Sequence, residues 1–199
     1  MHKEKTFVAI KPEGIQRRLI GEIIARFEKK GLKLIAAKFA CPTRELIEQH
    51  YLADEEWLES SGNKTYENYK SKGIDPKTTP RELALRTHKR CVDHLADRTL
   101  MAMVWEGPHA VEISRKIAGF TNPLVAETGS IRGDFSSESY EMADGYDRSI
   151  LNMIHASGSP EEANREIDLW FDKSEIIDYD MVDSELILGK DWGRIKNRS

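Results

Sequence analysis

The sequence predicts an α+β fold built on a four-stranded antiparallel sheet. Four short apolar runs have the composition of buried strands, at residues 6–10, 32–40, 100–105 and 150–154. A segment with helical periodicity follows each of these runs. The predicted order of elements is strand, helix, strand, helices, strand, helix, strand, helix. Connections of this βαβ type indicate a sheet with helices on one face, a sandwich of the ferredoxin-like kind.

The first half of the chain supplies two of these strands. The first strand ends at Lys11, so we expect a lysine at its carboxyl edge, followed by a turn. Apolar residues then recur at helical spacing over 19–27, and Gly31 is a natural end for that helix. After the second strand, Thr43 caps a short helix that ends near Tyr51.

Residues 52–98 are polar and charged, and glycine and proline interrupt them. Thr79 and Glu82 have the spacing of a capping box, which predicts a helix over 80–96. Apolar and aromatic residues are spread through the segment, so it differs from a linker. We expect a helical insertion folded onto the main core, and a single domain over 1–199.

The second half has a less regular middle. After the third strand, helical periodicity covers 110–118, and an irregular stretch covers 120–135. Residues 136–148 are acidic and rich in serine, which predicts a surface excursion. A helix over 160–171 follows the fourth strand, and 172–199 form a C-terminal tail.

Composition restricts the classes of function. A net charge of −4 and a pI near 5.9 argue against a general nucleic-acid binder. The N-terminus has no apolar signal core, and no apolar run approaches the ~18 residues of a membrane span. Cys41 and Cys91 lack disulfide or metal spacing and suit a reducing compartment. We expect a cytoplasmic protein without a membrane partner or a specific nucleic-acid partner.

The segment around His155 has features of a phosphate-binding site. His155 ends the fourth strand, three residues after Asn152, and precedes a helix start at Ser159, where Glu162 completes a capping box. Helix N-termini present unpaired N–H groups to anions. Glu166 is within reach of the imidazole, where a carboxylate would fix the tautomer and leave the other nitrogen free to attack. An isolated buried histidine is more often a structural residue that is hydrogen-bonded within the core. The choice between a structural and a catalytic role for His155 therefore depends on the other residues of the chain.

Those other residues are cations and polar groups spread along the chain, namely Lys11, Arg115, Thr121, Arg132 and Asn152. Arginine binds phosphate oxygens bidentately, and lysine acts as a point charge. The chain has no Walker-type or kinase glycine-rich loop and no paired metal ligands. Each arginine alone is typical of a solvated surface. Together the residues favour phosphoryl transfer, which requires mainly positioning and charge neutralisation.

Several motifs stand in order along the chain and are specific individually. They are TFVAIKPEG at 6–14, MVWEG at 103–107, GFTNP at 119–123, SIRGDF at 130–135, NMIHAS at 152–157 and EIDLWF at 166–171. In sequence and order, this set closely resembles the nucleoside diphosphate kinase family, over residues 6 to 171.

The resemblance implies a ping-pong phosphotransferase that supports nucleoside triphosphate synthesis. A nucleoside triphosphate, typically ATP, would give its γ-phosphoryl group to His155, and the phosphohistidine would pass it to a nucleoside diphosphate such as GDP. Mg²⁺ would arrive on the nucleotide phosphates, which explains why no protein metal site is visible. An unperturbed imidazole pKa of about 6.5 makes the neutral form available at pH 7.

The resemblance also implies roles for single residues. Lys11 and Asn152 would bind the sugar hydroxyls, with Lys11 also near the transferred group. Glu166 would orient His155, and Ser157 matches the serine two residues after the nucleophile. The residues implied on the phosphate side are Tyr51, Arg115, Thr121 and Arg132.

The chain departs from the family's usual pattern at three places. The segment 52–98 is longer than in typical members, and it includes the place of the base-stacking aromatic, a role open to Trp57 or Leu58. The stretch that contains 136–148 is also expanded. Gly158 stands where many members have an acidic residue, which puts one water-mediated Mg²⁺ contact in doubt.

Two other functions are compatible with this fold. One is a nucleotide-binding or scaffolding relative whose insertions have abolished turnover, and the intact set of site residues disfavours it. The other is a ferredoxin-like RNA-binding module, which the acidic balance disfavours. Family members are usually hexamers or tetramers, so we expect a homo-oligomer of unspecified size.

Overall fold

The structure is a computed structural model that describes residues 3–183 of the 199-residue chain. Its centre is one sheet of four strands: β1 (Glu4–Ile10), β2 (Lys33–Ala40), β3 (Leu100–Gly107) and β4 (Ile154–Ala156). The strand order is β2-β3-β1-β4, and each neighbouring pair is antiparallel. The predicted fold class, a ferredoxin-like α+β sandwich, is therefore confirmed.

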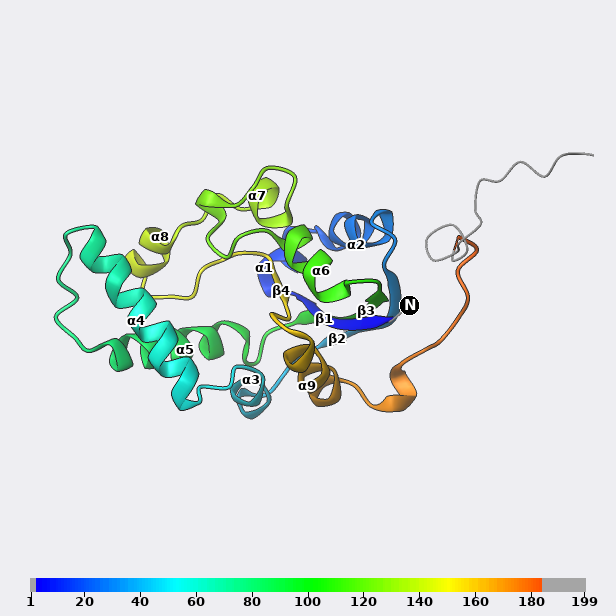
Figure 1. Ribbon diagram of the computed structural model, residues 1–199, viewed down its shortest axis with the longest axis horizontal. Coiled ribbons are helices and arrows are strands. Elements are labelled where there is room, and N and C mark those ends of the chain that lie inside the picture. Colours follow the sequence, from blue (N-terminus) through cyan, green and yellow to red (C-terminus); the bar gives the residue numbers. More distant parts are fainter. Residues whose placement is uncertain (1–2, 184–199) are drawn as a thin grey trace, which may run out of the picture.

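Helices cover both faces of this sheet, because its central strands are apolar on successive residues. Phe7 packs on one face with Trp170, in a core that α3 (Arg44–His50), α5 (Pro80–Leu95) and α9 (Pro160–Trp170) share. Val8 packs on the other face with Phe27 and Trp105, in a core completed by α2 (Ile20–Lys29), α6 (Ala110–Ala118) and α7 (Ile131–Phe135). Figure 1 shows α9 and α3 on one side of the sheet and α2 and α6 on the other. The prediction of helices on one face is wrong in this respect.

The helix bounds agree with much of the predicted pattern. The α-helices are α1 (Pro12–Gln16), α2 (Ile20–Lys29), α3 (Arg44–His50), α4 (Glu55–Ser71), α5 (Pro80–Leu95), α6 (Ala110–Ala118), α7 (Ile131–Phe135), α8 (Tyr140–Gly145) and α9 (Pro160–Trp170). Two 3₁₀ helices, η1 (Pro123–Val125) and η2 (Lys173–Glu175), complete the set among the described residues.

Some local predictions are wrong. The turn after Lys11 is the short helix α1, and the stretch 120–135 contains η1 and α7. At the start of α9, Ser159 caps Glu162 as predicted, but the Glu162 carboxylate accepts the N–H of Gly158 and does not close the capping box on Ser159.

The fourth strand is shifted relative to its predicted position, 150–154. β4 contains only Ile154–Ala156, so His155 is its middle residue and pairs in register with Ala9. Met153 precedes it with φ 69°, in the left-handed region that ends regular strand pairing. The Met153 N–H donates to Glu13 at 3.0 Å, and its carbonyl accepts the Lys11 N–H at 2.9 Å. The loop after β1 and the entry to β4 therefore hold each other.

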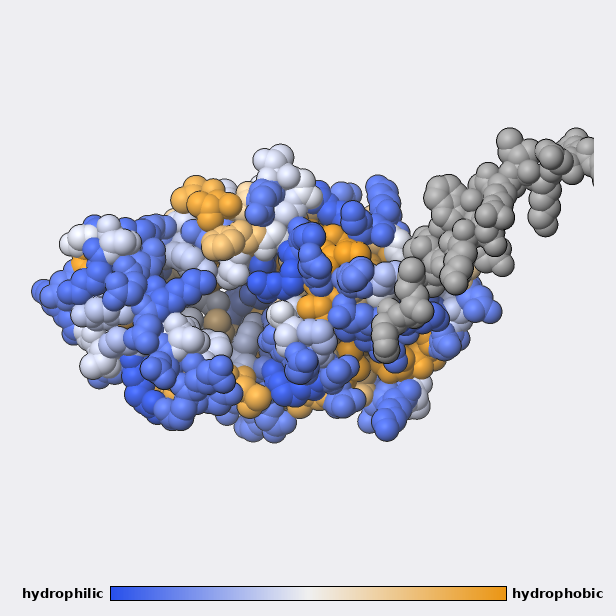
Figure 2. All heavy atoms as spheres, in the orientation of Figure 1, coloured by the Kyte–Doolittle hydropathy of each residue, from blue (hydrophilic) through white to orange (hydrophobic). Residues whose placement is uncertain are grey.

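The segment predicted as an insertion extends to one side of the sheet. α4 and α5 pack together there, and α8 lies beside α4 (Figure 1). Three groups make what we call the α4–α8 contact: Tyr69 donates to Asp144, Lys72 pairs with Glu141, and Arg90 pairs with Asp144 and Asp147. Residues 136–148 are thus a packed excursion, joined to the predicted insertion. A hollow separates this end from the sheet body in the space-filling view (Figure 2).

The described part of the tail runs along β2, an edge strand. The Ile177 N–H donates to the Ile35 carbonyl at 2.8 Å, and the Tyr179 hydroxyl donates to the Leu34 carbonyl at 3.0 Å. These contacts cover part of the sheet edge. The rest of the predicted tail, 184–199, lies outside the described residues. Within 3–183, no helix combines the length and the apolar character that crossing a membrane requires.

Candidate active site

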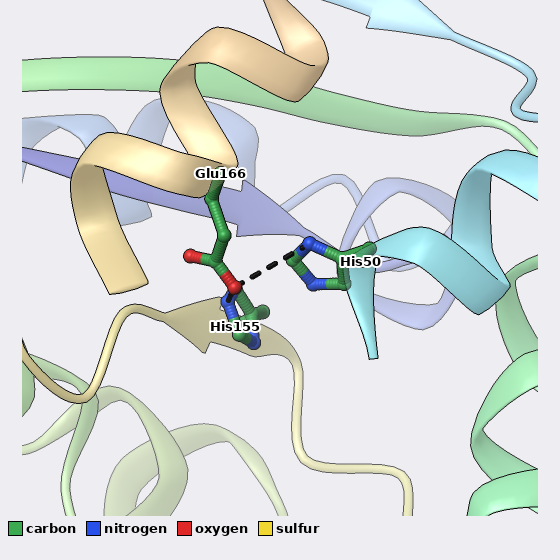
Figure 3. A group of neighbouring side chains, drawn as sticks. All are labelled: His50, His155 and Glu166. Atoms are coloured by element: carbon green, nitrogen blue, oxygen red, sulfur yellow. Dashed lines mark hydrogen bonds and ion pairs between the residues drawn. The ribbon is translucent and has the colours of Figure 1, made fainter. Parts of the chain in front are cut away.

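His155 lies against a buried carboxylate. Glu166 Oε1 is 2.9 Å from His155 Nε2, and Ser157 donates to Glu166 Oε2 at 2.6 Å. Figure 3 shows Glu166 reaching from α9 to the edge of the His155 ring, with His50 facing the same oxygen. Because Nε2 is engaged, Nδ1 is the ring nitrogen left for reaction.

His50 lies on the other side of this carboxylate. Its Nδ1 is 3.4 Å from Glu166 Oε1, and its ring meets the His155 ring edge-on at 4.5 Å between centroids. The indole N–H of Trp170 donates to the same Nδ1 at 3.2 Å. We call His50, His155, Ser157, Glu166 and Trp170 the Glu166 cluster.

The spacing of this cluster also invites a comparison with metal sites. Ligand atoms of His50, His155 and Glu166 all lie within 4.8 Å of one another. A metal would need the lone pair on His50 Nδ1, which already accepts the Trp170 N–H. The arrangement therefore suits hydrogen bonding better than metal ligation.

Lys11 and Asn152 meet close to His155. The buried Lys11 Nζ donates to Asn152 Oδ1 at 2.8 Å, and Asn152 Nδ2 donates to the Thr121 carbonyl at 2.9 Å. Burial is the main reason why the pKa of Lys11 is lowered, with the Arg132 charge acting in the same direction. Asn152 thus joins three of the predicted residues, because Arg132 also donates to its carbonyl.

Arg132 has more backbone contacts than its predicted role requires. Nε, Nη1 and Nη2 donate to the carbonyls of Asn152, Gly119 and Ile154, at 3.3, 2.8 and 2.8 Å. A guanidinium has five N–H groups, so two remain for a phosphate. Arg132 therefore ties the α6–η1 loop to β4. Arg115 projects from α6 as an exposed side chain.

The electrostatic environment favours a neutral His155. Burial is the largest cause that lowers its pKa, to about 3, and the positive charges of Lys11, Arg132 and Arg115 act in the same direction, against Glu162. Burial and the Arg115 charge also lower the pKa of Arg132 to about 10. The imidazole therefore keeps an unprotonated nitrogen at physiological pH.

Tyr51, Trp57 and Leu58, which the sequence places near the nucleotide, lie in different surroundings in the structure. The Tyr51 ring is 6.0 Å from the His155 ring, and burial raises the Tyr51 pKa, so its hydroxyl remains a donor. Leu58 is buried within the α4–α5 pair, which excludes it as a platform for a base. Trp57 is half-buried and packs edge-on against His88 at 6.1 Å.

Several residues of the site were missed by sequence reasoning. Glu13 is buried and accepts both the Met153 N–H and a hydrogen bond from His94 Nε2 at 2.9 Å. Burial opposes ionisation, but the His94 hydrogen bond and the Lys11 charge prevail and lower the pKa of Glu13 to about 2. The sequence assigns no role to His50 and includes Trp170 only in the motif at 166–171. The signal that was available is chemical: a carboxylate directly after a buried strand requires partners.

Comparison with protein families gives one match over most of the chain. The model described as "Nucleoside diphosphate kinase" matches residues 4–70 and 82–176. The unmatched interval, 71–81, lies between α4 and α5. This is the part of the predicted insertion that the family pattern does not include.

Individual relatives agree with this match. The nucleoside diphosphate kinase of Pyrobaculum aerophilum is 42% identical over 183 residues, covering 89% of this chain and all of that protein. That of Schizosaccharomyces pombe is 40% identical over 180 residues, covering 90% of this chain and 94% of the relative.

Solved structures agree as well. The crystal structure of the Pyrobaculum aerophilum NDP kinase superposes with a TM-score of 0.85 at 41% identity, over 89% of this chain and 100% of that one. A nucleoside-diphosphate kinase from Borrelia burgdorferi, a transition-state mimic with bound vanadate and ADP, gives 0.76 at 31% identity, over 94% and 98%.

Proposed function

This chain belongs to the nucleoside diphosphate kinase family, a family of phosphotransferases, and we propose that it carries out the reaction through Nδ1 of His155. The γ-phosphoryl group of a nucleoside triphosphate, typically ATP, passes to His155 and then to a nucleoside diphosphate. The observation that carries this assignment is the 2.9 Å contact between Glu166 and Nε2, because it leaves Nδ1 as the nucleophile.

The first half-reaction forms one bond and breaks one. The Nδ1 lone pair attacks the γ-phosphorus, and the bond from that phosphorus to the β,γ-bridging oxygen breaks. The departing nucleoside diphosphate takes the bonding electrons. The imidazole becomes positively charged. Its Nε2–H continues to donate a hydrogen bond to the Glu166 carboxylate, whose negative charge stabilises the positive ring. In the second half-reaction, a terminal β-phosphate oxygen of the acceptor attacks the phosphorus and frees Nδ1.

The cations supply the charge that this transfer needs. Arg115 and the two unused N–H groups of Arg132 hold the phosphates, with the Thr121 hydroxyl and Tyr51 beside them. Lys11 and Asn152, already bonded to each other at 2.8 Å, bind the sugar hydroxyls, and Lys11 also faces the transferred group. The set is contributed by six separate segments, so its positions depend on the folded sheet.

Mg²⁺ enters this reaction on the nucleotide phosphates. The carboxylates nearest to His155 already have partners: Glu166 binds His155 and Ser157, and Glu162 accepts the Gly158 N–H at 2.6 Å. This donor set fits a metal that is bound by phosphate oxygens and water.

We propose three further properties of the whole protein. The chain forms a single nucleoside diphosphate kinase domain with an insertion, it assembles as a homo-oligomer, and it acts in the cytoplasm. Cys41 and Cys91 are both free, which supports a reducing compartment.

The test is phosphoenzyme formation with ATP and Mg²⁺ in the absence of an acceptor. We expect an acid-labile phosphoprotein in the unaltered protein that GDP discharges, and none in His155→Ala. His109→Asn is the matched control, since His109 is exposed, distant in sequence, and has a left-handed backbone that asparagine tolerates. Nucleotide binding without a phosphoenzyme would contradict the proposal and favour the inactive, nucleotide-binding relative.

A further inference from the structure

Within the Glu166 cluster, the protonation of the His50 ring is decided by the two groups that lie next to its Nδ1. Two groups approach His50 Nδ1: the Trp170 indole nitrogen at 3.2 Å and Glu166 Oε1 at 3.4 Å. An indole nitrogen only donates, so Nδ1 must accept, and the neutral ring carries its proton on Nε2. The carboxylate oxygen and Nδ1 then face each other with lone pairs and form no hydrogen bond.

We propose that Trp170 is a positioning residue whose indole N–H keeps His50 Nδ1 as an acceptor, and so reserves Glu166 Oε1 for His155. This inference rests on the proposed function, because it concerns the nucleophile that the proposal assigns. Its consequence is a single proton arrangement in the cluster: Nε2–H of His155 donates to Glu166, and His155 Nδ1 keeps its lone pair.

Helix α9 supplies both halves of this arrangement. Glu166 and Trp170 are four residues apart, so their side chains lie on the same helix face. Arg165 of the same helix donates to the Gln49 and His50 carbonyls at 2.8 and 3.0 Å, which fixes the end of α3. The His50 ring is therefore held from its backbone and from its Nδ1.

The packing leaves the indole little freedom. Trp170 is buried and stacks on Phe7 at 5.4 Å between ring centroids. Phe7 also lies 5.6 Å from the His50 ring and 5.9 Å from the His155 ring, so all three rings share one support. The N–H direction is thus set by the core.

Charged and titratable groups face His50 from several elements. They are His155 of β4, Glu166 and Arg165 of α9, Lys11 after β1, and the adjacent Tyr51. Burial is the main cause that lowers the pKa of His50 to about 3, and Glu166 alone opposes the charges of His155, Arg165 and Lys11. A neutral His50 agrees with the geometry.

Without the indole N–H, two arrangements compete. His50 can move its proton to Nδ1, or gain a second proton there, and then donate to Glu166 Oε1 across the 3.4 Å gap. His155 then shares Glu166 Oε1 with His50, and the proton of His155 can move to Nδ1. That tautomer has no lone pair at the attacking nitrogen, so phosphorylation slows.

The experiment compares two tryptophan variants of the full chain. Trp170→Phe keeps the stacked ring and removes the N–H. Trp105→Phe makes the same change in the other core, where the indole nitrogen has no hydrogen-bond partner within residues 3–183. The readout is the single-turnover rate of phosphoenzyme formation with ATP and Mg²⁺ against pH, with circular dichroism to verify folding.

We expect Trp170→Phe to slow phosphorylation about tenfold at both pH 6 and pH 8, because the neutral Nδ1–H tautomer of His50 competes for Glu166 at either pH. Trp105→Phe should stay within about twofold of the unaltered protein. In the double variant Trp170→Phe/His50→Leu, the leucine cannot donate to Glu166. Its rate of phosphoenzyme formation should recover to within about threefold of the rate of the unaltered protein. Equal rates for both tryptophan variants, or no recovery in the double variant, would overturn the inference.

A second measurement needs no variant. Nitrogen NMR of labelled histidine should find His50 protonated on Nε2 in the unaltered protein, and an Nδ1–H tautomer there would overturn the inference. Absence of a phosphoenzyme in the unaltered protein would instead contradict the proposed function. The two failures are therefore distinguishable.

Discussion

Two polar regions of this molecule are built in opposite ways. In the Glu166 cluster the carboxylate is fully buried, and each of its oxygens has a specific partner. In the α4–α8 contact, the side chains of Asp147 and Glu141 are mostly exposed, and the largely buried Arg90 pairs with Asp144 and Asp147 at the same time. A buried polar group that loses its partner costs about 1–3 kcal/mol, whereas an exposed ion pair contributes about 0–1 kcal/mol.

This difference shows that the number of ion pairs says little about what they do. The cluster fixes one proton arrangement, and any substitution there changes the chemistry. The α4–α8 contact joins α4 and α5 to residues 141–147 through charged side chains that are partly open to water and salt.

Glu166→Gln tests the buried region most severely. The amide keeps the shape but removes the charge that stabilises the phosphorylated imidazole, so we expect phosphorylation of His155 to slow by about 10²–10³-fold. Single-turnover rates with ATP measure this loss, and it should persist in about 1 M salt, since the site is buried. A loss that salt abolishes would show that Glu166 behaves like a surface charge.

Acid should destabilise the fold through the same region. The pKa values of His50 and His155 are both lowered to about 3, so the unfolded chain binds these protons near pH 6.5 while the folded chain does not. The free energy of unfolding should therefore fall as the pH drops from about 6.5 towards 3, by up to about 1.4 kcal/mol per pH unit for each histidine.

Other groups adjust this pH dependence. Because the pKa of Glu13 is lowered to about 2, the free energy of unfolding falls further as the pH drops below the ordinary glutamate pKa of 4.5. Burial raises the pKa of Glu166, so protonation of Glu166 in the folded protein offsets part of this fall. Urea unfolding at several pH values measures the slope. His50→Leu should reduce the slope, and an unchanged slope would contradict the assignment.

Arg90→Ala tests the α4–α8 contact and should have the smallest effect. Loss of its pairs with Asp144 and Asp147 should lower the free energy of unfolding by about 1 kcal/mol at low salt, and by less in high salt. Lys89→Ala, on the same helix, is the control, since among the described residues 3–183 Lys89 pairs only with Asp93 of its own helix. A salt-independent loss for Arg90→Ala would mean that the contact behaves as a buried one.

Much of the fold could be predicted because its signals are local. Runs such as 6–10 and 100–105, and the capping box at Thr79, are read from neighbouring residues. The predicted strand 150–154 was displaced because the left-handed turn at Met153 depends on contacts with Glu13 and Lys11, far away in the sequence. Periodicity contains no information about such contacts.

The candidate site divides in the same way. The contact of His155 with Glu166 could be predicted because eleven residues of strand, turn and helix bring them together. The approach of His50, 120 residues before Trp170, is a tertiary contact that no local pattern reveals. Arg132 was identified as a cation, but its three backbone contacts depend on where the loop after α6 lies.

The position of β4 at the edge of the sheet also governs when the enzyme becomes complete during synthesis. Among the described residues 3–183, β4 is the last strand to leave the ribosome, and it pairs with the first, β1. Phe7 and Ser157 meet although 150 residues separate them. The strands β1, β2 and β3 and their helices can assemble before it. A nascent chain that stops short of α9 has a sheet and several cations but no oriented nucleophile. Under the proposed function, His155 therefore becomes oriented for phosphorylation only after α9 has been synthesised.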